Sequence, residues 1–494
     1  MSFIINQVKK GLFLDSVMLM QISRSVSKLA SVEEAALMMA TPANQQILRD
    51  SNLLQLGDQE VVGGDLIVAV RAKDESSAIR AIEQAISSLS APVTASVGSQ
   101  AIQPRTLRSA LKVNSGANLA LISVPGDFAC GEGRKALRSG LNVMIFSDNV
   151  PLKEEIAIKE EAREKRLIVM GPDCGTALIG GTPLGFGNRV PTGAIGIIGA
   201  SGTGIQEVST LIANKGAGIS HAIGVGGRDL CDEVGGISTL TAIDWLESDQ
   251  MTQHIVLISK PPSTAVAKKI ITRLGNAPKP ATVCFLGAQN FDMPANVVSA
   301  RTLRAVAASA LNSTEEIFGQ FRPPKNLRFS GKLIRGLFSG GSLAAEAQII
   351  LLDQGCTLQS NVPIQGVETL VDDSTMHTLL DLGADQYTRG RPHPMIDPEV
   401  RNDLLVQALS DDEIGVILID VVIGFGANEN PAAHVVRAIQ QKPNRDTLVV
   451  ASVTGTENDP QILSHQIAIL ESAGVLVAPS NAHATEVAWA CVST

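Results

Sequence analysis

The strongest constraint on the fold is a regular alternation that begins near residue 118. Short runs that are apolar throughout, such as LALISV (119–124) and HIVLIS (254–259), alternate with amphipathic segments of helical period. Strands that are apolar on both faces belong to parallel sheets covered by helices on both sides. Three such series follow one another along the chain and predict three doubly wound lobes of the Rossmann or flavodoxin type, in an α/β protein.

The first ninety residues have a different pattern. Three strand-like runs, at 2–8, 32–40 and 65–72, alternate with helix-like runs at 15–29, 42–52 and 74–89. This pattern predicts a small α+β unit of the ferredoxin-like or ACT-like kind. Small and polar residues dominate 90–110, which is typical of a linker. With 494 residues the chain is too long for one core, and we expect four domains. Their expected bounds are 1–92, 93–190, 191–325 and 326–494.

Composition excludes several classes of function. The net charge of −9 and the scattered basic residues argue against a general nucleic-acid surface. The six cysteines lie far apart without a CxxC pair, as in a reduced cytoplasmic protein, and no ligand spacing for a metal is present. No apolar run approaches 18 residues, and the N-terminus lacks the apolar centre of a signal peptide. We therefore expect a cytoplasmic protein without a metal site.

The segment GIIGASGTGIQEV (196–208) is an apolar strand followed by a small-residue turn and a helix. Ser201, Gly202, Thr203 and Gly204 lie at this helix start, where free N–H groups and the helix dipole attract an anion. The alternative is a tight βα turn in which the serine only caps the helix. The stretch 195–218 has an echo at 334–356, with a Ser-Gly turn and a terminal glycine, which indicates either two related lobes or two independent turns.

Several strings indicate a family. ISVPGDFACGEGRKALRSGLNVMIFSDNVP (122–151) and MGPDCGTALIGGTPLGFG (170–187) resemble the succinyl-CoA synthetase α subunit, and this likeness covers about 118–290. Over the whole chain, GLFLDSVMLMQIS (11–23), GVGGRDL (224–230), ISKPP (258–262), GRPHPMIDP (390–398) and GFGANENP (424–431) resemble the FdrA family. The resemblance implies a CoA-binding-like lobe followed by synthetase-like lobes.

FdrA-family membership implies one subunit of an oxamate carbamoyltransferase in purine and allantoin catabolism. That reaction splits oxalurate with phosphate into oxamate and carbamoyl phosphate, and it requires companion subunits. A homo-oligomer, a small anionic substrate and phosphate or carbamoyl phosphate as ligand are expected, without nucleic acid or a membrane. The alternatives are an NDP-forming acyl-CoA synthetase that binds CoA, and a non-catalytic scaffold subunit.

The inherited chemistry is incomplete. Succinyl-CoA synthetases carry phosphate on a histidine soon after the strand that matches ATVCFLGA, whereas 286–308 here contain no histidine. Lys260 stands where the resemblance places the glutamate that steadies the phosphohistidine. The glycine-rich turn after the first strand of the CoA-binding domain also has no counterpart, which disfavours CoA. Ser201, Gly202 and Thr203 match the residues that hold the transferred phosphate.

Other candidates follow from residue type and position. Arg228 and Lys260 are expected at strand ends, where ligands gather in open sheets. Arg391 and His393 lie in a proline-stiffened loop, with the arginine suited to a carboxylate and the histidine to proton transfer. A second anion turn or partner site is expected at Ser339, Gly340, Gly341 and Ser342, with Asn428 and Glu429. The alternatives are a surface pair of Arg228 with Asp229, a solvated lysine and a histidine that only makes a hydrogen bond.

Overall fold

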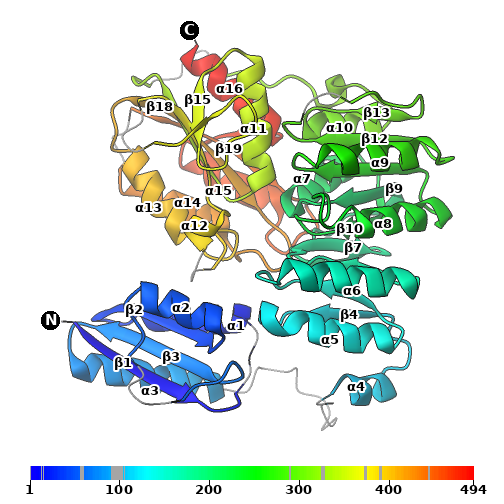
Figure 1. Ribbon diagram of the computed structural model, residues 1–494. Coiled ribbons are helices and arrows are strands. Elements are labelled where there is room, and N and C mark those ends of the chain that lie inside the picture. The colour runs from blue at the N-terminus through cyan, green and yellow to red at the C-terminus, as the bar shows by residue number, and fades with distance from the viewer. Residues whose placement is uncertain are drawn as a thin grey trace. The chain divides into compact units, whose positions relative to one another are not determined.

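The computed structural model describes residues 2–12, 14, 16–55, 60–90, 104, 106–288, 291–323, 329–371, 375–388, 392–442 and 446–493 (Figure 1). The chain forms two compact units. The first comprises 1–154 with 389–392, and the second comprises 155–388 with 393–494.

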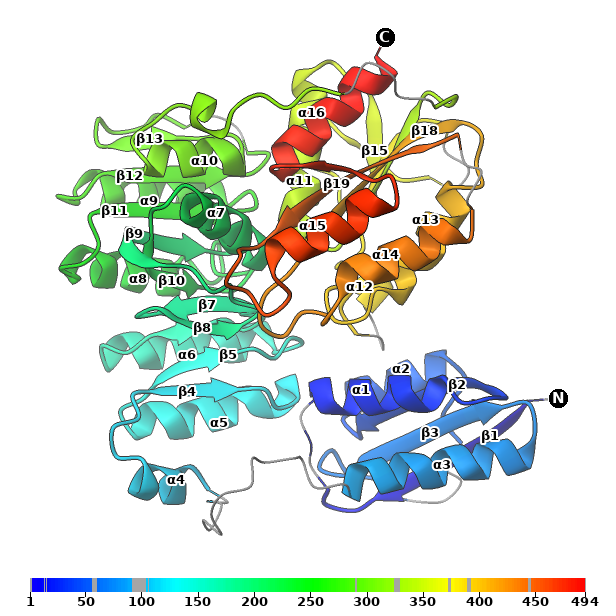
Figure 2. The ribbon, with the colours of Figure 1, turned by 180° about the vertical axis from the view of Figure 1, so that it is seen from behind.

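The N-terminal domain is an antiparallel sheet of three strands with helices on both faces (Figure 2). Strands β1 (Phe3–Lys9), β2 (Val32–Met39) and β3 (Leu66–Ala72) pair in the order β1-β3-β2. Alternate residues of β3 face opposite layers. Leu66, Val68 and Val70 pack against helices α1 (Ser16–Ser27) and α3 (Glu75–Ser90), whereas Ile67 and Ala69 pack on the side of α2 (Pro42–Asp50). The predicted small α+β unit is therefore confirmed.

The rest of the first unit begins the α/β alternation. Helix α4 (Leu107–Val113) precedes β4 (Leu119–Ile122), α5 (Gly126–Arg138) and β5 (Asn142–Ile145). Strands β4 and β5 pair in parallel, as predicted from their apolar sequences. Helix α6 (Leu152–Glu164) contains the boundary between the units, and the short strand β6 (Val169–Met170) lies in the second unit.

The second unit contains two seven-stranded sheets, and the first of them forms the lobe that we call lobe A. Its strand order is β13-β12-β11-β9-β10-β7-β8, and the strands from β13 to β10 are parallel. The chain passes from β9 (Thr192–Gly199) to β10 (Ile219–Gly224) on one side, and then returns to β11 (His254–Ser259) on the other. This reversal makes the carboxyl end of β9 a topological switch point, the usual ligand position in such sheets.

Other elements complete lobe A. They are β7 (Thr176–Ile179), β8 (Thr182–Gly185), α7 (Gly202–Asn214), α8 (Ile237–Ser248), α9 (Thr264–Gly275), β12 (Ala281–Phe285), β13 (Val297–Ser299), α10 (Leu303–Ala310) and a 3₁₀ turn at Glu315–Phe318. The glycine-rich passage around 180 is an antiparallel hairpin, β7–β8, which was not predicted. Gly180 and Gly181 both have positive φ there, as a tight two-residue hairpin turn requires.

Lobe B, formed by the second seven-stranded sheet, is parallel throughout. Its strand order is β16-β15-β17-β14-β18-β19-β20. The strands are β14 (Leu333–Phe338), β15 (Leu358–Ser360), β16 (Glu368–Thr369), β17 (His377–Asp381), β18 (Ile414–Val422), β19 (Leu448–Thr454) and β20 (Leu476–Ala478). The helices are α11 (Gly341–Asp353), α12 (Asp385–Thr388), α13 (Glu399–Ala408), α14 (Pro431–Gln440), α15 (Leu463–Ser472) and α16 (Asn481–Val492). The predicted α/β class with parallel-sheet lobes is confirmed.

Two buried glutamates relate lobes A and B to each other. Glu207 and Glu346 are each the sixth residue of a 13-residue helix, α7 and α11 respectively, and both are buried. Glu207 accepts a hydrogen bond from the Asn481 N–H at the start of α16 in lobe B. Glu346 accepts from the Leu303 and Arg304 N–H groups at the start of α10 in lobe A. Each lobe thus caps the last helix of the other, which favours two related lobes over two independent turns as the reading of the sequence echo.

In the part of the chain that the structure describes, no helix is long and apolar enough to cross a membrane. The same part holds no group of three or more histidine, cysteine or acidic side chains with the geometry of a metal site.

Because of the Glu346 carboxyl, we expect the free energy of unfolding to depend on pH. Burial, with the nearby charge of Glu207, raises its pKa from the ordinary 4.5 to about 7. The folded chain therefore holds a proton that the unfolded chain releases, so this contribution is full below about pH 4.5 and is lost as the pH rises through 7. Between those limits we expect a loss on the order of 3 kcal/mol in the free energy of unfolding, measured by urea denaturation.

The matched variants are Glu346→Gln and, as control, Glu429→Gln, which changes an exposed side chain. The first should flatten this pH slope, and the second should keep it. An unchanged slope in Glu346→Gln would show that another group causes it.

Candidate functional site

The starts of helices α7 and α11 meet where lobes A and B join. Ser201 caps α7, because its Oγ accepts the Gly204 N–H at 3.0 Å. The same Oγ forms a short hydrogen bond with the Ser342 Oγ in the first turn of α11. A Cβ on Gly340 would lie 3.0 Å from the Thr203 side chain. Two turns that are 141 residues apart are thus brought into direct contact.

The first amides of both helices lack hydrogen-bond acceptors. Helix geometry leaves the N–H groups of Gly202, Thr203, Gly341 and Ser342 without intrahelical acceptors. None of them has another acceptor among the residues that the structure describes. Each helix start carries roughly half a positive charge, so the pair attracts an anion more strongly than one start would.

A buried hydroxyl also lies beside this junction. Thr176, on β7, is 4% exposed, and its Oγ1 has no hydrogen-bond partner in the described part of the chain. That oxygen is 3.2 Å from the position that a Cβ on Gly202 would occupy. A buried hydroxyl without a partner is costly unless something binds to it. Thr176 was not predicted, because its string, MGPDCGTA, indicates a scaffold.

Part of the predicted SGGS turn is occupied internally. The Asp420 carboxylate accepts the N–H groups of Ser339 and Gly340, both at 2.7 Å. The fully buried Arg401 donates to the Ser339 Oγ at 3.2 Å and to the Asp420 carbonyl at 2.7 Å. The structure therefore uses Ser339 and Gly340 to hold the turn, and presents Gly341 and Ser342 to the junction.

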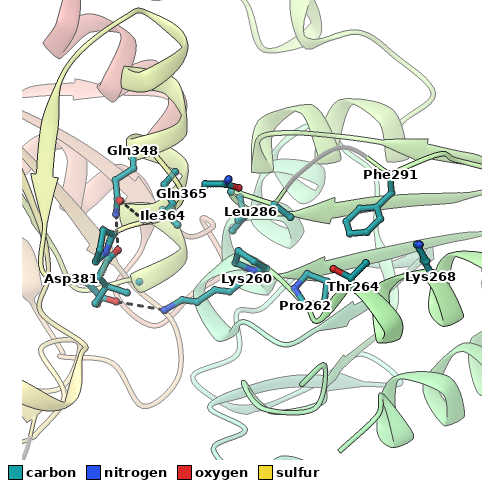
Figure 3. Close-up of a pocket in the computed structure, with 17 residues that line it drawn as sticks. Lys260, Pro262, Thr264, Lys268, Leu286, Phe291, Gln348, Ile364, Gln365 and Asp381 are labelled. Atoms are coloured by element: carbon teal, nitrogen blue, oxygen red, sulfur yellow. Dashed lines mark hydrogen bonds and ion pairs between the residues drawn. The ribbon is translucent and has the colours of Figure 1, made fainter. Parts of the chain in front are cut away.

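A cavity of about 490 Å³ opens beside the start of α11, between the strand ends of lobes A and B (Figure 3). Lys260, at the end of β11, points across it toward Asp381 at the end of β17. The Lys260 Nζ is 3.8 Å from the Asp381 Oδ2, and the lysine side chain is 49% exposed. The predicted lysine therefore lies at the site, together with a carboxylate that was not predicted.

Asp381 is held firmly in this position. The Asn361 side chain accepts the Asp381 N–H at 2.8 Å and donates to its carbonyl at 2.9 Å. The Asp381 Oδ1 accepts the Gly383 N–H at 3.0 Å. Burial raises the pKa of Asp381, while Lys260 and the Gly383 N–H oppose the shift. One signal for this residue existed in the sequence, since it ends the apolar run HTLLD.

His393 lies beside Gly383, on the same side as the Asp381 carboxylate. Its Nε2 would be 2.7 Å from a Cβ on Gly383, and the Asp381 Oδ1 would be 3.2 Å from the same point. The His393 Nδ1 accepts the Met395 N–H at 3.2 Å, and the Phe186 ring lies 6.3 Å from the imidazole ring. Burial lowers the pKa of His393 to about 4, so the ring is neutral near pH 7. The neutral tautomer then carries its proton on Nε2.

Arg228 belongs to another network. Its Nη2 is 2.8 Å from the Oε2 of Glu155, which also pairs with Lys159 at 2.7 Å. Asp229 pairs with Lys159 at 2.8 Å, so the alternative of an Arg228–Asp229 surface pair is wrong. Lys159, Glu155 and Asp229 form the buried part of this network, and removing any one of them would leave a buried charge without its partner.

The remaining candidates are not brought to the junction. Asn428 donates to the Ile396 carbonyl at 3.0 Å and accepts the Asn430 N–H at 3.0 Å, so its side chain holds its own loop. Glu429 is exposed. Arg391 lies outside the described residues.

Three family models match parts of the chain. The model described as "AllF, heavy metal-associated domain" matches residues 1–104, "CoA binding domain" matches 191–287, and "CoA-ligase" matches 337–491. The last two cover most of lobes A and B respectively. Residues 1–104, which the first model matches, contain neither cysteine nor histidine. Methionine is therefore the only side chain there of the kind that soft metals prefer.

Individual relatives extend these matches. The chain is 40% identical over 497 residues to "Uncharacterized protein YahF" of Escherichia coli K12, covering 96% of both chains. It is 30% identical over 164 residues to "Succinate--CoA ligase [ADP-forming] subunit alpha" of Aquifex aeolicus, covering 31% of this chain and about half (51%) of that subunit.

Among solved structures, the Ca. Korarchaeum cryptofilum dinucleotide-forming acetyl-coenzyme A synthetase 1 in complex with phosphate and ADP is 15% identical. The likeness covers 76% of this chain and 82% of that chain, with a TM-score of 0.33. At this TM-score nothing about the site follows from it.

The close packing at the start of α11 gives a steric prediction. A Cβ on Gly341 would lie 2.4 Å from the Asp381 Oδ2 and 3.3 Å from the Lys260 Nζ. Although alanine favours helices, Gly341→Ala should lower the free energy of unfolding by about 1–3 kcal/mol, because the clamped Asp381 has to move. Gly227→Ala is the control, since its Cβ would meet nothing within 4 Å. Equal stability of Gly341→Ala and the unaltered chain, measured by urea denaturation, would contradict the placement of Asp381.

Proposed function

We propose a function for this chain, which belongs to the family of the Escherichia coli protein YahF. The chain binds phosphate and acyl phosphates at the α7–α11 junction, as a subunit of a phosphate-dependent transferase. The observation that carries the proposal is the meeting of two helix starts beside Lys260 and a cavity of about 490 Å³. Four amides without acceptors, the one hydroxyl hydrogen that the Ser201–Ser342 bond leaves free and one lysine are a donor set for a tetrahedral oxyanion.

The finer proposal is an FdrA-type subunit of an oxamate carbamoyltransferase. The family model named for AllF supports a link to allantoin breakdown. The absence of histidine from 286–308 supports transfer to free phosphate rather than through a phosphohistidine. The CoA-ligase and CoA-binding matches support a shared scaffold, because carbamoyl phosphate and acyl phosphates are both mixed anhydrides of phosphate.

The proposed reaction balances with these groups. An oxygen of monohydrogen phosphate attacks the ureido carbonyl carbon of oxalurate, and the bond from that carbon to the nitrogen of oxamate breaks. The phosphate proton is transferred to the departing nitrogen, which gives oxamate and carbamoyl phosphate. Helix starts hold the phosphate in place, and Lys260 offsets the charge that develops on the carbonyl oxygen. The companion subunits expected from the FdrA resemblance would contribute the remaining contacts.

A second candidate function is an NDP-forming acyl-CoA synthetase. The 30% identity to a succinate–CoA ligase α subunit and the two CoA-related family matches favour it. In that case CoA would stabilise the purified chain against heat.

Ligand-dependent thermal denaturation tests the proposal. We expect phosphate and carbamoyl phosphate to raise the unfolding midpoint of the purified chain, and CoA to leave it unchanged. Lys260→Met should weaken the binding of both anions on the order of tenfold, because one charge-assisted contact of about 1.5 kcal/mol is lost. Lys332→Met is the matched control, because Lys332 is exposed just before β14, at the opposite end of the sheet.

Stabilisation by CoA without stabilisation by phosphate would overturn the carbamoyltransferase proposal in favour of the second candidate. In the complex assembled with companion subunits, release of carbamoyl phosphate from oxalurate and phosphate should fall in Lys260→Met and persist in Lys332→Met.

A further inference from the structure

A carboxylate is an unexpected group at a site that binds anions. The Asp381 Oδ2 lies against the first residue of α11, 2.4 Å from where a Gly341 Cβ would be, and the Lys260 Nζ is 3.3 Å from the same point. The Asp381 side chain is only 5% exposed and lines the cavity. An anion at the α7–α11 junction therefore has both a lysine and a carboxylate beside it.

We propose that Asp381 selects the anion by accepting a hydrogen bond from a protonated oxygen of it, so that the junction binds phosphate and rejects sulfate. The inference rests on the proposed function and names the ligand class of the same site: tetrahedral oxyanions that still carry a proton. Phosphate carries a proton at neutral pH, whereas sulfate carries none. A carboxylate accepts hydrogen bonds only, so it attracts the first and repels the second.

Several groups around this point donate. The amides of Gly341 and Ser342 and the Lys260 ammonium are donors, and His393, with its proton on Nε2, is a donor beside Gly383. Thr176, buried and without a partner beside Gly202, points independently to a ligand at this junction. A set made only of donors would take any oxyanion. Asp381 is a fixed carboxylate acceptor that lines the cavity, and such an acceptor gives specificity by penalising the wrong partner.

The position of Asp381 is also fixed in advance. Asn361 holds its backbone on both sides, and the Gly383 N–H holds its Oδ1 at 3.0 Å, which leaves the Oδ2 toward Lys260 and the cavity. A rigid carboxylate cannot turn away from a sulfate ion to relieve the repulsion. The same oxygen is placed to receive the phosphate proton as the phosphate oxygen attacks, and to pass that proton to the departing nitrogen, which keeps the reaction balanced.

Isothermal titration calorimetry of the full chain with inorganic phosphate, sulfate and methyl phosphate at pH 8 tests the proposal. Methyl phosphate is a dianion without an acidic proton at this pH. If the proton on the anion determines the binding affinity, methyl phosphate binds as weakly as sulfate. We expect phosphate to bind at least tenfold more tightly than either. Asp381→Asn should bind sulfate at least tenfold more tightly than the unaltered chain, because the carboxamide both donates and accepts. The control Asp385→Asn, an exposed carboxylate four residues later, should keep the original preference.

The outcomes separate the two proposals. If neither phosphate nor carbamoyl phosphate binds the unaltered chain, the proposed function fails. If phosphate, sulfate and methyl phosphate bind the unaltered chain equally, the anion site stands and the role of Asp381 is wrong; this comparison needs no variant and holds even if Asp381→Asn fails to fold. A preference for phosphate that survives in Asp381→Asn also overturns the role of Asp381.

Discussion

The second unit is organised around two helix starts that face each other. The positive ends of α7 and α11 come together at the Ser201–Ser342 contact, and like partial charges repel in a buried setting. Carboxylates surround this junction. Asp420 occupies the two amides that precede α11, and Asp381 lies against its first residue. These carboxylates offset the repulsion between the two helix starts, so the lobes can be joined at this point. The amides that remain free are those that the proposed phosphate would bind.

The two lobes share the position of a buried glutamate and differ at the turns that meet in this junction. Glu207 and Glu346 keep equivalent positions and cap the last helices of opposite lobes, so each is needed for the association of both. The turns themselves differ: Ser201 caps α7 with its side chain, whereas Gly340 at the corresponding place relies on Asp420. A tight glycine turn in lobe B leaves space for the cavity and for Asp381, which a side chain at residue 341 would displace.

Individual residues show how far a sequence can indicate a site. Lys260 was identified correctly as a strand-end cation, because the apolar run HIVLIS before it predicts a buried strand. Arg228 was given the same role on the same grounds, yet it pairs with Glu155 on a helix 73 residues away, and strand-end position alone does not reveal such a partner. Asp381 was missed because β17 is inserted between β14 and β15, and the order of strands in a sheet is not written in their local patterns.

The sequence by itself determined the α/β class, the small N-terminal α+β unit, the parallel strands and the helix starts after Gly199 and Ser339. These features depend on hydrophobic periodicity and turn chemistry, which act over a few residues. Only the tertiary structure decided that the two helix starts meet, that Thr176 and Asp381 adjoin them, and that Arg228 and Asn428 serve structural networks. Those outcomes depend on contacts between residues that are far apart in the chain. Local patterns do not indicate which distant residue pairs with a buried charge.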